Sequence, residues 1–457
     1  MQGMQPVRAI FCYAFRVLAP GPRQDSGFAV NVFDNDTLQY LCYARSGDGV
    51  HWEKPSLGLY EWRGSTDNNI LMGGSICHNF TPMLDTNPAC PEDMRIKAVA
   101  GTHPALYAFA SADGLHFHRI SDQPALTLER TRYGFDSQNV IFYDGARGVY
   151  CIYSRFFSKE GVRCIERSES VDCIHWSTPV PNVYTAGQEE HLYTNATTPC
   201  PGAEHMLFSF PMRFAEGRAR PVVRGSRGVS DAVFMTSRDG HLWDRRFQDS
   251  LIDGGLDERS WTQRSNMPVY GLLDMGDEFS LYVMKRYSWE DACLVRCSVR
   301  PHGFAALHAG AQAGTLRTKP IVFAGSALRV NFATSATGGI RFALIDPATG
   351  EPFEGFSFDD CAELFGNALR EEVHFAGGSL APLSGRPVIL AVSTNDGLGA
   401  NAKSIGLLLN TRHYYFVPFG QDDPQGKENS LVARMELIPE TVEMALEGKR
   451  MQPQIRL

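Results

Sequence analysis

The sequence predicts an all-β protein, and three features of the chain lead to this class. Short runs of apolar residues alternate with polar ones and end at Gly-containing turns, which is the pattern of antiparallel strands joined by hairpins. A box of the form Ser-x-Asp-x-x-x-aromatic occurs repeatedly at intervals of roughly 60 to 70 residues, a spacing that fits one box per four-stranded propeller blade. Beyond residue 305 the box is absent, while short apolar runs continue between Gly-rich turns. The sequence therefore predicts a five-bladed β-propeller followed by an antiparallel β-sandwich.

The blades follow in order along residues 1–305. The first is irregular, because no carboxylate precedes its inner strand, and the fifth lacks the box. Their expected spans are 8–60, 75–125, 130–182, 185–250 and 260–305.

Two further segments follow the propeller. Residues 306–420 contain apolar runs such as Ala327–Phe332 and Pro387–Val392 between Gly-rich turns, which is typical of a β-sandwich. Residues 421–457 are polar and charged, with one helical stretch expected at Pro439–Glu447. We expect this last segment to be a polar C-terminal extension.

The repeated box favours a structural role over a chemical one. Its Asp-Gly pair suits a tight hairpin turn, its Ser and Asp side chains can bond local backbone, and its aromatic residue can fill the space between blades. The boxes are Ser46–Trp52, Ser111–Phe117, Ser170–Trp176 and Ser237–Trp243.

Composition limits the classes of function. The formal net charge of −8, with no visible basic stripe, argues against nucleic acid as a partner. The 11 cysteines include no CxxC pair with metal spacing, so we expect free thiols, no metal and no cofactor. Neither a signal peptide nor an apolar run of transmembrane length is visible, which predicts a cytoplasmic protein without a membrane partner. A homo-oligomer is left open.

The hairpin after Asp136 gives the clearest indication of a site. Asp136 precedes an apolar strand, an Asp-Gly turn follows at Asp144, and a second strand leads to Arg155. Because a hairpin reverses direction, Arg155 should return to the same end as Asp136. Related units place Asp85 and Glu190 before other strands. If these strands start on one face of the propeller, the three carboxylates converge at its central mouth.

Convergent carboxylates suit cleavage of a glycosidic bond, since one can protonate the leaving oxygen while another attacks or activates water. Arginines at the ends of the second strands can either pair with these acids or bind a substrate group bidentately. We expect the remaining polar residues of the mouth to bind sugar hydroxyl groups. The expected substrate-binding residues are Asn87, Gln138, Asn139, Arg155, His191, Tyr193, Arg213, Asn266 and Arg286.

Several stretches resemble bacterial propeller proteins classed near glycoside hydrolases. They are Ser46–Ile70, Phe135–Val140, Glu190–Ala196 and Gly355–Cys361. The wider architecture is similar to glycoside hydrolase family 32, whose members cleave fructofuranosides. The resemblance implies Asp85 as nucleophile, Asp136 as transition-state stabiliser and Glu190 as acid/base, with retention of configuration at the anomeric carbon.

Two other functions stay open. The rim arginines also fit an exo-glycosidase for an acidic sugar, with Tyr193 as the nearby nucleophile candidate. The irregular first blade also fits a carbohydrate-binding protein without catalysis. In each case an oligosaccharide or glycoside is the expected ligand.

Overall fold

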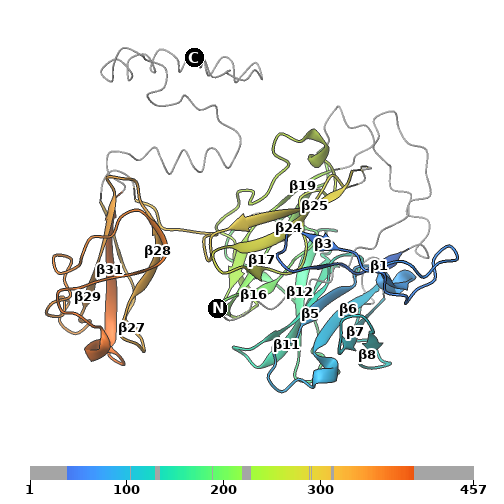
Figure 1. The fold of residues 1–457 in the computed structure, drawn as a ribbon, viewed down its shortest axis with the longest axis horizontal. Coiled ribbons are helices and arrows are strands. Elements are labelled where there is room, and N and C mark those ends of the chain that lie inside the picture. The colour runs from blue at the N-terminus through green and yellow to red at the C-terminus, as the bar shows by residue number, and fades with distance from the viewer. Residues whose placement is uncertain are drawn as a thin grey trace, which may run out of the picture. The chain divides into compact units, whose positions relative to one another are not determined.

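The structure is a computed structural model. It describes residues 39–102, 104–128, 134–187, 189–218, 228–287, 289, 291–309 and 313–395. Strands joined by turns and short 3-10 helices make up its regular structure, so the protein is all-β (Figure 1). The chain divides into two compact units, Met1–Phe304 and Ala305–Leu457. The strands expected before residue 39 and the extension expected at 421–457 lie outside the described residues.

The first unit begins with two short antiparallel pairs. Strand β1 (Tyr40–Cys42) pairs with β4 (Ile70–Gly73), and β2 (Arg45–Ser46) pairs with β3 (Trp52–Glu53). A 3-10 helix, η2 (Ser75–Cys77), leads from β4 into the next sheet.

The second sheet has β6 and β7 at its centre and antiparallel neighbours on both sides. A 3-10 helix, η3 (Glu92–Met94), lies in the connection from its first strand to its second. The strands are β5 (Thr81–Leu84), β6 (Ile96–Thr102), β7 (Ala105–Ser111), β8 (His118–Arg119) and β9 (Leu126–Thr127).

The third sheet contains the predicted hairpin. Its four strands follow in sequence order, and Val140 pairs with Tyr153 while Asp144 pairs with Val149. The predicted hairpin is therefore confirmed. The strands are β10 (Val140–Asp144), β11 (Val149–Phe157), β12 (Arg163–Ser170) and β13 (Val180–Pro181).

The fourth region forms two sheets. The larger one runs in the order β14-β21-β20-β17-β16, and a three-stranded one runs β15-β18-β19. The strands are β14 (Val183–Tyr184), β15 (His191–Leu192), β16 (Thr198–Cys200), β17 (Ala203–Ser209), β18 (Met212–Ala215), β19 (Val229–Ala232), β20 (Met235–Ser237) and β21 (Leu242–Asp244).

The last sheet of the first unit follows the 3-10 helix η4 (Glu258–Ser260). Strand β24 is central and pairs with the other three strands. The strands are β22 (Met267–Pro268), β23 (Leu273–Asp274), β24 (Phe279–Lys285) and β25 (Cys293–Val299).

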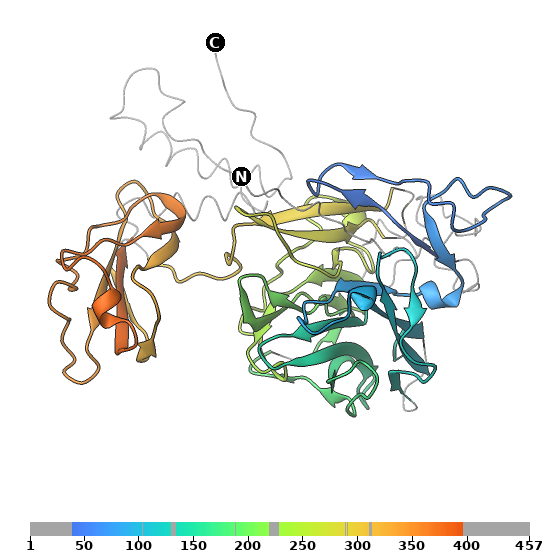
Figure 2. The same ribbon diagram turned by 60° about the horizontal axis from the view of Figure 1, so that its bottom comes forward.

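Consecutive sheets of the first unit share apolar clusters. Leu41 and Phe80 belong to one buried cluster, Met83 and Ile141 to a second, Val140 and Trp243 to a third, and Phe208 and Phe279 to a fourth. The blue N-terminal strands also lie beside the yellow strands β24 and β25 (Figures 1 and 2). There the ring centroids of Trp52 and Tyr282 are 5.6 Å apart, and the Tyr282 hydroxyl donates to the Gly49 carbonyl.

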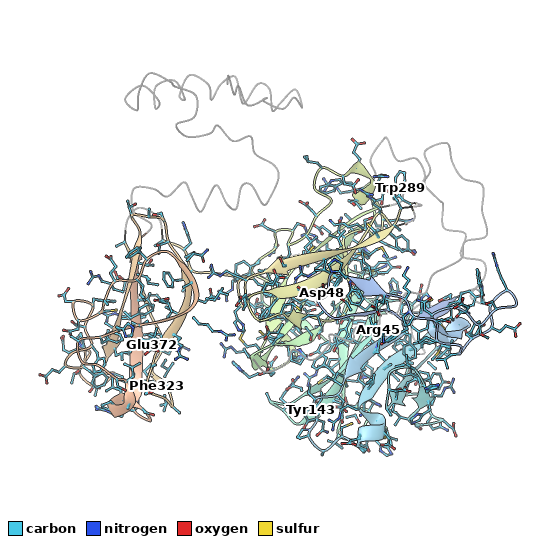
Figure 3. The ribbon with its side chains drawn as sticks, in the orientation of Figure 1. Arg45, Asp48, Tyr143, Trp289, Phe323 and Glu372 are labelled. Carbon is cyan, nitrogen blue, oxygen red and sulfur yellow. The ribbon has the colours of Figure 1, made fainter. Side chains whose placement is uncertain are left out.

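The four boxes form the expected local turns. In the first, Asp48 (labelled in Figure 3) accepts the backbone N–H groups of Val50 and His51, while the Ser46 hydroxyl accepts the Gly49 N–H. The fourth residue of each box has a positive φ, of 73°, 75° and 75° at Gly49, Gly114 and Gly240, and 62° at Cys173. Because this conformation favours Gly, Cys173 occupies a position that most side chains avoid.

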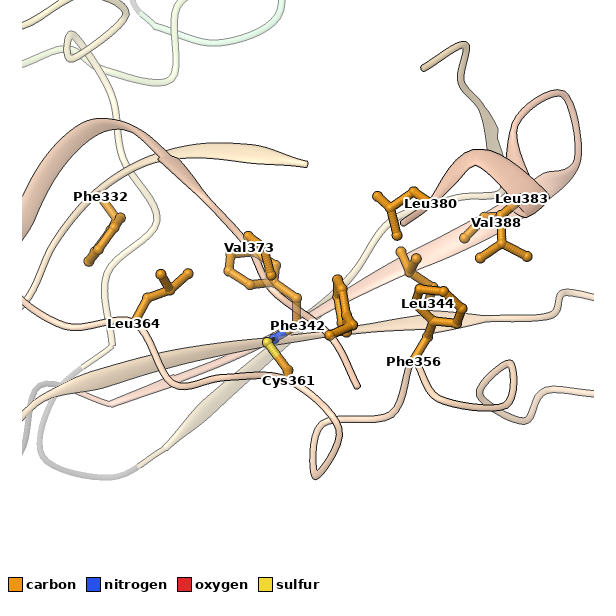
Figure 4. Close-up of a cluster of buried hydrophobic side chains, with 11 residues drawn as sticks. Phe332, Phe342, Leu344, Phe356, Cys361, Leu364, Val373, Leu380, Leu383 and Val388 are labelled. Carbon is orange, nitrogen blue, oxygen red and sulfur yellow. Dashed lines mark hydrogen bonds between the residues drawn. The ribbon is translucent and has the colours of Figure 1, made fainter. Parts of the chain in front are cut away.

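The second unit has two antiparallel sheets around its own core. In one sheet β31 pairs with β26, β27 and β29, and in the other β28 pairs with β30. Phe332, Phe342, Leu344 and Val388 belong to one buried cluster, which joins the two sheets (Figure 4). The elements are β26 (Gly314–Arg317), β27 (Ile321–Val322), β28 (Arg329–Ala333), β29 (Gly339–Ile345), β30 (Asn367–Glu372), the 3-10 helix η5 (Ala381–Leu383) and β31 (Pro387–Asn395).

Candidate functional site

Asp136 lies in a tight turn just before β10. The Ser137 N–H donates to the Phe135 carbonyl at 2.8 Å, and the Asn139 amide donates to the carbonyls of Phe135 and Ser137, each at 3.0 Å. Asn139 is fully buried, whereas the Asp136 side chain is 34% exposed. Asn139 was expected to bind a sugar hydroxyl group. Its buried side chain instead bonds the backbone and holds the turn that carries Asp136.

His78 is the direct partner of Asp136. Its Nε2 lies 2.6 Å from Asp136 Oδ1, and its Nδ1 lies 2.9 Å from Gln39 Oε1. Burial on its own would raise the pKa of Asp136. The hydrogen bond and charge of His78, with the charges of Arg155 and Arg264, outweigh this effect and lower that pKa below its ordinary value. Asp136 is therefore an ionised carboxylate at neutral pH.

Tyr193 is surrounded by arginines from three separate segments. The guanidinium carbons of Arg155, Arg163 and Arg264 lie 4.8, 5.0 and 5.7 Å from the centroid of its ring. These distances are in the range of cation–π contacts. Arg155 is at the end of the confirmed hairpin, so the prediction that it returns to the end that carries Asp136 agrees with the structure.

The Asp136 and Tyr193 segments are directly joined. The Ser137 hydroxyl donates to the Tyr193 carbonyl, the Ala196 N–H donates to Gln138 Oε1 at 2.7 Å, and the Asn195 amide donates to the Gln138 carbonyl at 3.1 Å. Gln138, expected to bind substrate, links the segment before β10 to the segment before β16.

Glu190 lies three residues before Tyr193, at the start of β15. Its Oε2 accepts from Arg245 at 2.7 Å, and its Oε1 is 3.4 Å from Arg213 Nη1. The neighbouring His191 faces Arg163, with 2.9 Å between His191 Nδ1 and Arg163 Nη1. Burial and the charge of Arg163 lower the pKa of His191 despite the opposing charges of Glu216 and Glu189, so its imidazole is neutral at pH 7.

Asp85 lies at the other end of β5, contrary to the prediction. Strand β5 runs from Thr81 to Leu84; His78, the partner of Asp136, precedes it, and Asp85 follows it. Asp85 Oδ2 is 2.5 Å from Lys97 Nζ and accepts from the Tyr150 hydroxyl at 2.8 Å. The expected register was wrong because the strand begins after His78 and Asn79, so the carboxylate falls beyond its last residue.

Three other residues that we expected to bind substrate contact protein groups instead. The Asn87 amide donates to the Tyr150 hydroxyl at 2.9 Å, beside Asp85. The Asn266 amide donates to the carbonyls of Ser230 and Ser260. Arg286 pairs with Asp257 at 2.8 Å and with Asp291 at 2.6 Å.

Arg213 pairs with Asp231 at 2.5 Å as well as facing Glu190. Pairing with an acid is the first of the two roles expected for the rim arginines. The arginine that pairs most closely with Glu190 is Arg245, which sequence reasoning missed.

A recurring Asn in the sequence indicates which residues occupy equivalent positions before these strands. Asn79, Asn139, Asn195 and Asn266 each lie within three residues before a strand at the edge of its sheet, at β5, β10, β16 and β22. Aligning the repeats on this Asn places His78, and not Asp85, near the position of Asp136. The same alignment places Arg264, two residues before Asn266, near this position. Arg163, at the start of β12, carries no comparable local signal, because only the fold brings it to Tyr193.

The described residues contain no group of three or more His, Cys, Asp or Glu side chains arranged to hold a metal ion.

No helix in the described part of the chain is long and apolar enough to cross a membrane.

Comparisons with known proteins give limited likenesses. No family model matches the sequence. A stretch of 87 residues is 42% identical to one of the subunits of dipicolinate synthase from Bacillus subtilis strain 168, covering 19% of this chain and 44% of that protein. The chain therefore spans less than half the length of this curated relative.

Three solved structures show a weak likeness to this chain. A beta-fructofuranosidase from Schwanniomyces occidentalis complexed with fructosyl-erythritol has a TM-score of 0.35 at 10% identity, covering 78% of this chain and 86% of that one. A beta-1,2-mannobiose phosphorylase from Listeria innocua has a TM-score of 0.39 at 14% identity, covering 58% and 68%. A thermostable family-43 glycoside hydrolase has a TM-score of 0.38 at 12% identity, covering 57% and 81%. Likenesses at this level carry no argument about function, which depends on the site itself.

Proposed function

We propose that the first unit is a glycosidase in which Asp136 and Glu190 act on the glycosidic bond of a sugar bound beside Tyr193. One observation supports this most strongly. Hydrogen bonds join residues 137–138 to residues 193–196, and the two segments carry partly exposed carboxylates, 34% at Asp136 and 30% at Glu190. Most glycoside hydrolases use a pair of carboxyl groups that flank the glycosidic bond.

The two carboxylates take different roles in this proposal. Asp136, whose pKa is lowered, stays ionised and stabilises the positive charge that develops at the anomeric carbon, or attacks it. Glu190 donates a proton to the leaving oxygen and then accepts one from water. Asp85 has no part, because its carboxylate is buried in an ion pair at the far end of β5. The resemblance that implied a fructofuranoside substrate also implied a triad that includes Asp85. Because Asp85 lies elsewhere, we propose cleavage of a glycosidic bond without naming a fructofuranoside.

The proposal predicts that Asp136→Asn and Glu190→Gln each lower hydrolysis by at least about 100-fold, because each removes a charge or proton that the reaction uses. Hydrolysis is measured on a panel of neutral and acidic aryl glycosides, and proton NMR of the first product distinguishes retention, expected from the resemblance, from inversion.

Asp93→Asn is the matched control, since Asp93 is exposed on η3 and should keep full activity. Circular dichroism should show both site variants folded. If both keep wild-type rates on every substrate that is cleaved, or if the wild type cleaves none of the panel, the proposal is wrong.

We further propose that the sheets of the first unit close into a five-bladed ring. Shared apolar clusters link the sheets in sequence order, and the contact of Tyr282 with Trp52 and Gly49 supports closure between the last sheet and the first pairs. Such a ring would bring the segments before β5, β10 and β16 to a common mouth.

A further inference from the structure

We propose that the arginines around Tyr193 bind a carboxylate group of the sugar, so that the substrate is an acidic sugar such as a uronate. This rests on the proposed function and names its substrate class. The sequence pointed to Arg155, Arg213 and Arg286 for such a role. The structure replaces the last two with Arg163 and Arg264.

The geometry gathers positive charge at one aromatic ring. Arg155, Arg163 and Arg264 all lie within 6 Å of the Tyr193 ring, and they come from β11, from the start of β12 and from the loop before β22. Arg155 is 2% exposed, and the Arg163 side chain is 17% exposed. Like charges in a largely buried cluster repel one another and lose hydration, so negative charge beside them is favourable.

Two carboxylates act on this cluster. The charge of Asp136 acts on Arg155 and Arg264, and Glu216 Oε1 lies 3.6 Å from Arg163 Nη1. An anionic ligand would add further negative charge beside these three cations. A neutral sugar would bring no such gain.

Arg163 differs in its partners from Arg213 and Arg286, which form close ion pairs within the protein. Arg213 and Arg286 each have a carboxylate oxygen within 2.8 Å. Arg163 places its Nη1 2.9 Å from a neutral imidazole nitrogen of His191, and its carboxylate contact is longer. A ligand carboxylate would give this guanidinium a charged acceptor, and guanidinium and carboxylate groups match in shape and can form two parallel hydrogen bonds.

The test measures binding separately from hydrolysis. The full chain is titrated calorimetrically with glucuronate and galacturonate, with their neutral counterparts glucose and galactose, and with glucose 6-phosphate. We expect a uronate to bind at least about tenfold more tightly than its neutral counterpart, since hydrogen bonds to a charged group are the stronger kind. Glucose 6-phosphate as the preferred ligand, or equal binding of charged and neutral sugars, would overturn the inference.

Substitutions at Arg163 test whether this residue causes the preference for a uronate. Arg163→Gln should abolish the preference for the uronate, and Arg163→Lys should keep a smaller one, because lysine retains the charge but not the paired donors. Arg45→Gln is the control, since the side chain of Arg45 (labelled in Figure 3) is 57% exposed and pairs with Glu53. Unchanged preference in a folded Arg163→Gln protein contradicts the assignment. Should Arg163→Gln not fold, the Arg163→Lys result decides.

The outcomes separate this inference from the proposed function. Asp136-dependent cleavage of neutral glycosides without any preference for acidic ones would leave the glycosidase and reject the carboxylate site. Arg163-dependent uronate binding without cleavage of any glycoside would leave the carboxylate site and reject the glycosidase.

Discussion

At the scale of single residues, the contact between His78 and Asp136 decides what the site can do. A 2.6 Å hydrogen bond joins two side chains that are 58 positions apart in the chain. It favours the ionised form of Asp136, together with the nearby arginines. In the proposed reaction Asp136 must stay ionised next to a developing positive charge, and the hydrogen bond from His78 favours this ionised form. His78 is thus a positioning residue, which acts through Asp136.

We predict that His78→Gln shifts the acid limb of the activity profile to higher pH. The pKa of Asp136 is lowered in the folded protein, so activity that needs the carboxylate is lost only as pH falls through that lowered value. Without His78 the pKa rises, and the loss begins at higher pH. The measurement is kcat/KM against pH, with His116→Gln as control because His116 contacts only the turn acid Asp113 among the hydrogen bonds of its side chain in the described structure. An acid limb that stays in place for His78→Gln would show that Asp136 does not govern it.

At the scale of elements, β5 separates a reactive end from a structural end. His78 precedes the strand and meets Asp136, whereas Asp85 follows it and meets Lys97. The side chains of Lys97 and Asp85 are 3% and 0% exposed, and the Tyr150 hydroxyl completes the cluster. Burial on its own would raise the pKa of Asp85, but the hydrogen bond from Lys97 and those from Asn87, Cys90 and Tyr150 lower it. Asp85 thus joins β5 to β6 and β11.

We predict that Asp85→Asn lowers the free energy of unfolding by about 3–5 kcal/mol, because it leaves the buried charge of Lys97 without its partner. Urea denaturation followed by circular dichroism measures this difference. Asp93→Asn, on the exposed helix η3, should change stability by less than about 0.5 kcal/mol. A folded Asp85→Asn protein of wild-type stability with no glycosidase activity would restore the catalytic role that the resemblance implies.

At the scale of the whole molecule, the contact between the last sheet and the first strands matters most. Tyr282 is 6% exposed, its ring meets Trp52, and its hydroxyl donates to the Gly49 carbonyl across more than 200 residues of sequence. This joins the turn of the first box to the central strand β24. In the proposed ring it is the point where the chain closes.

We predict that Tyr282→Ala increases hydrogen exchange in residues 40–53 and lowers the free energy of unfolding by about 3–5 kcal/mol, the usual cost of removing a large buried aromatic side chain. Exchange measured by mass spectrometry should stay unchanged in β10 and β11. Tyr282→Phe keeps the ring and should cost only about 1 kcal/mol for the lost hydrogen bond. Equal exchange of residues 40–53 in the alanine variant and the wild type would argue against closure through this contact.

The sequence alone determined the local features of this protein. The all-β class, the box turns and the hairpin that carries Asp136 and Arg155 depend on periodicity and turn chemistry within a few residues, which are visible in the chain. Tertiary structure decided which end of each strand faces the site. It placed Asp85 away from Asp136, brought His78 to Asp136, and gathered Arg163 and Arg264 at Tyr193. A two-residue period shows which side chains share a face of a strand, but not where the strand begins relative to strands of other sheets, because that register depends on contacts between distant segments.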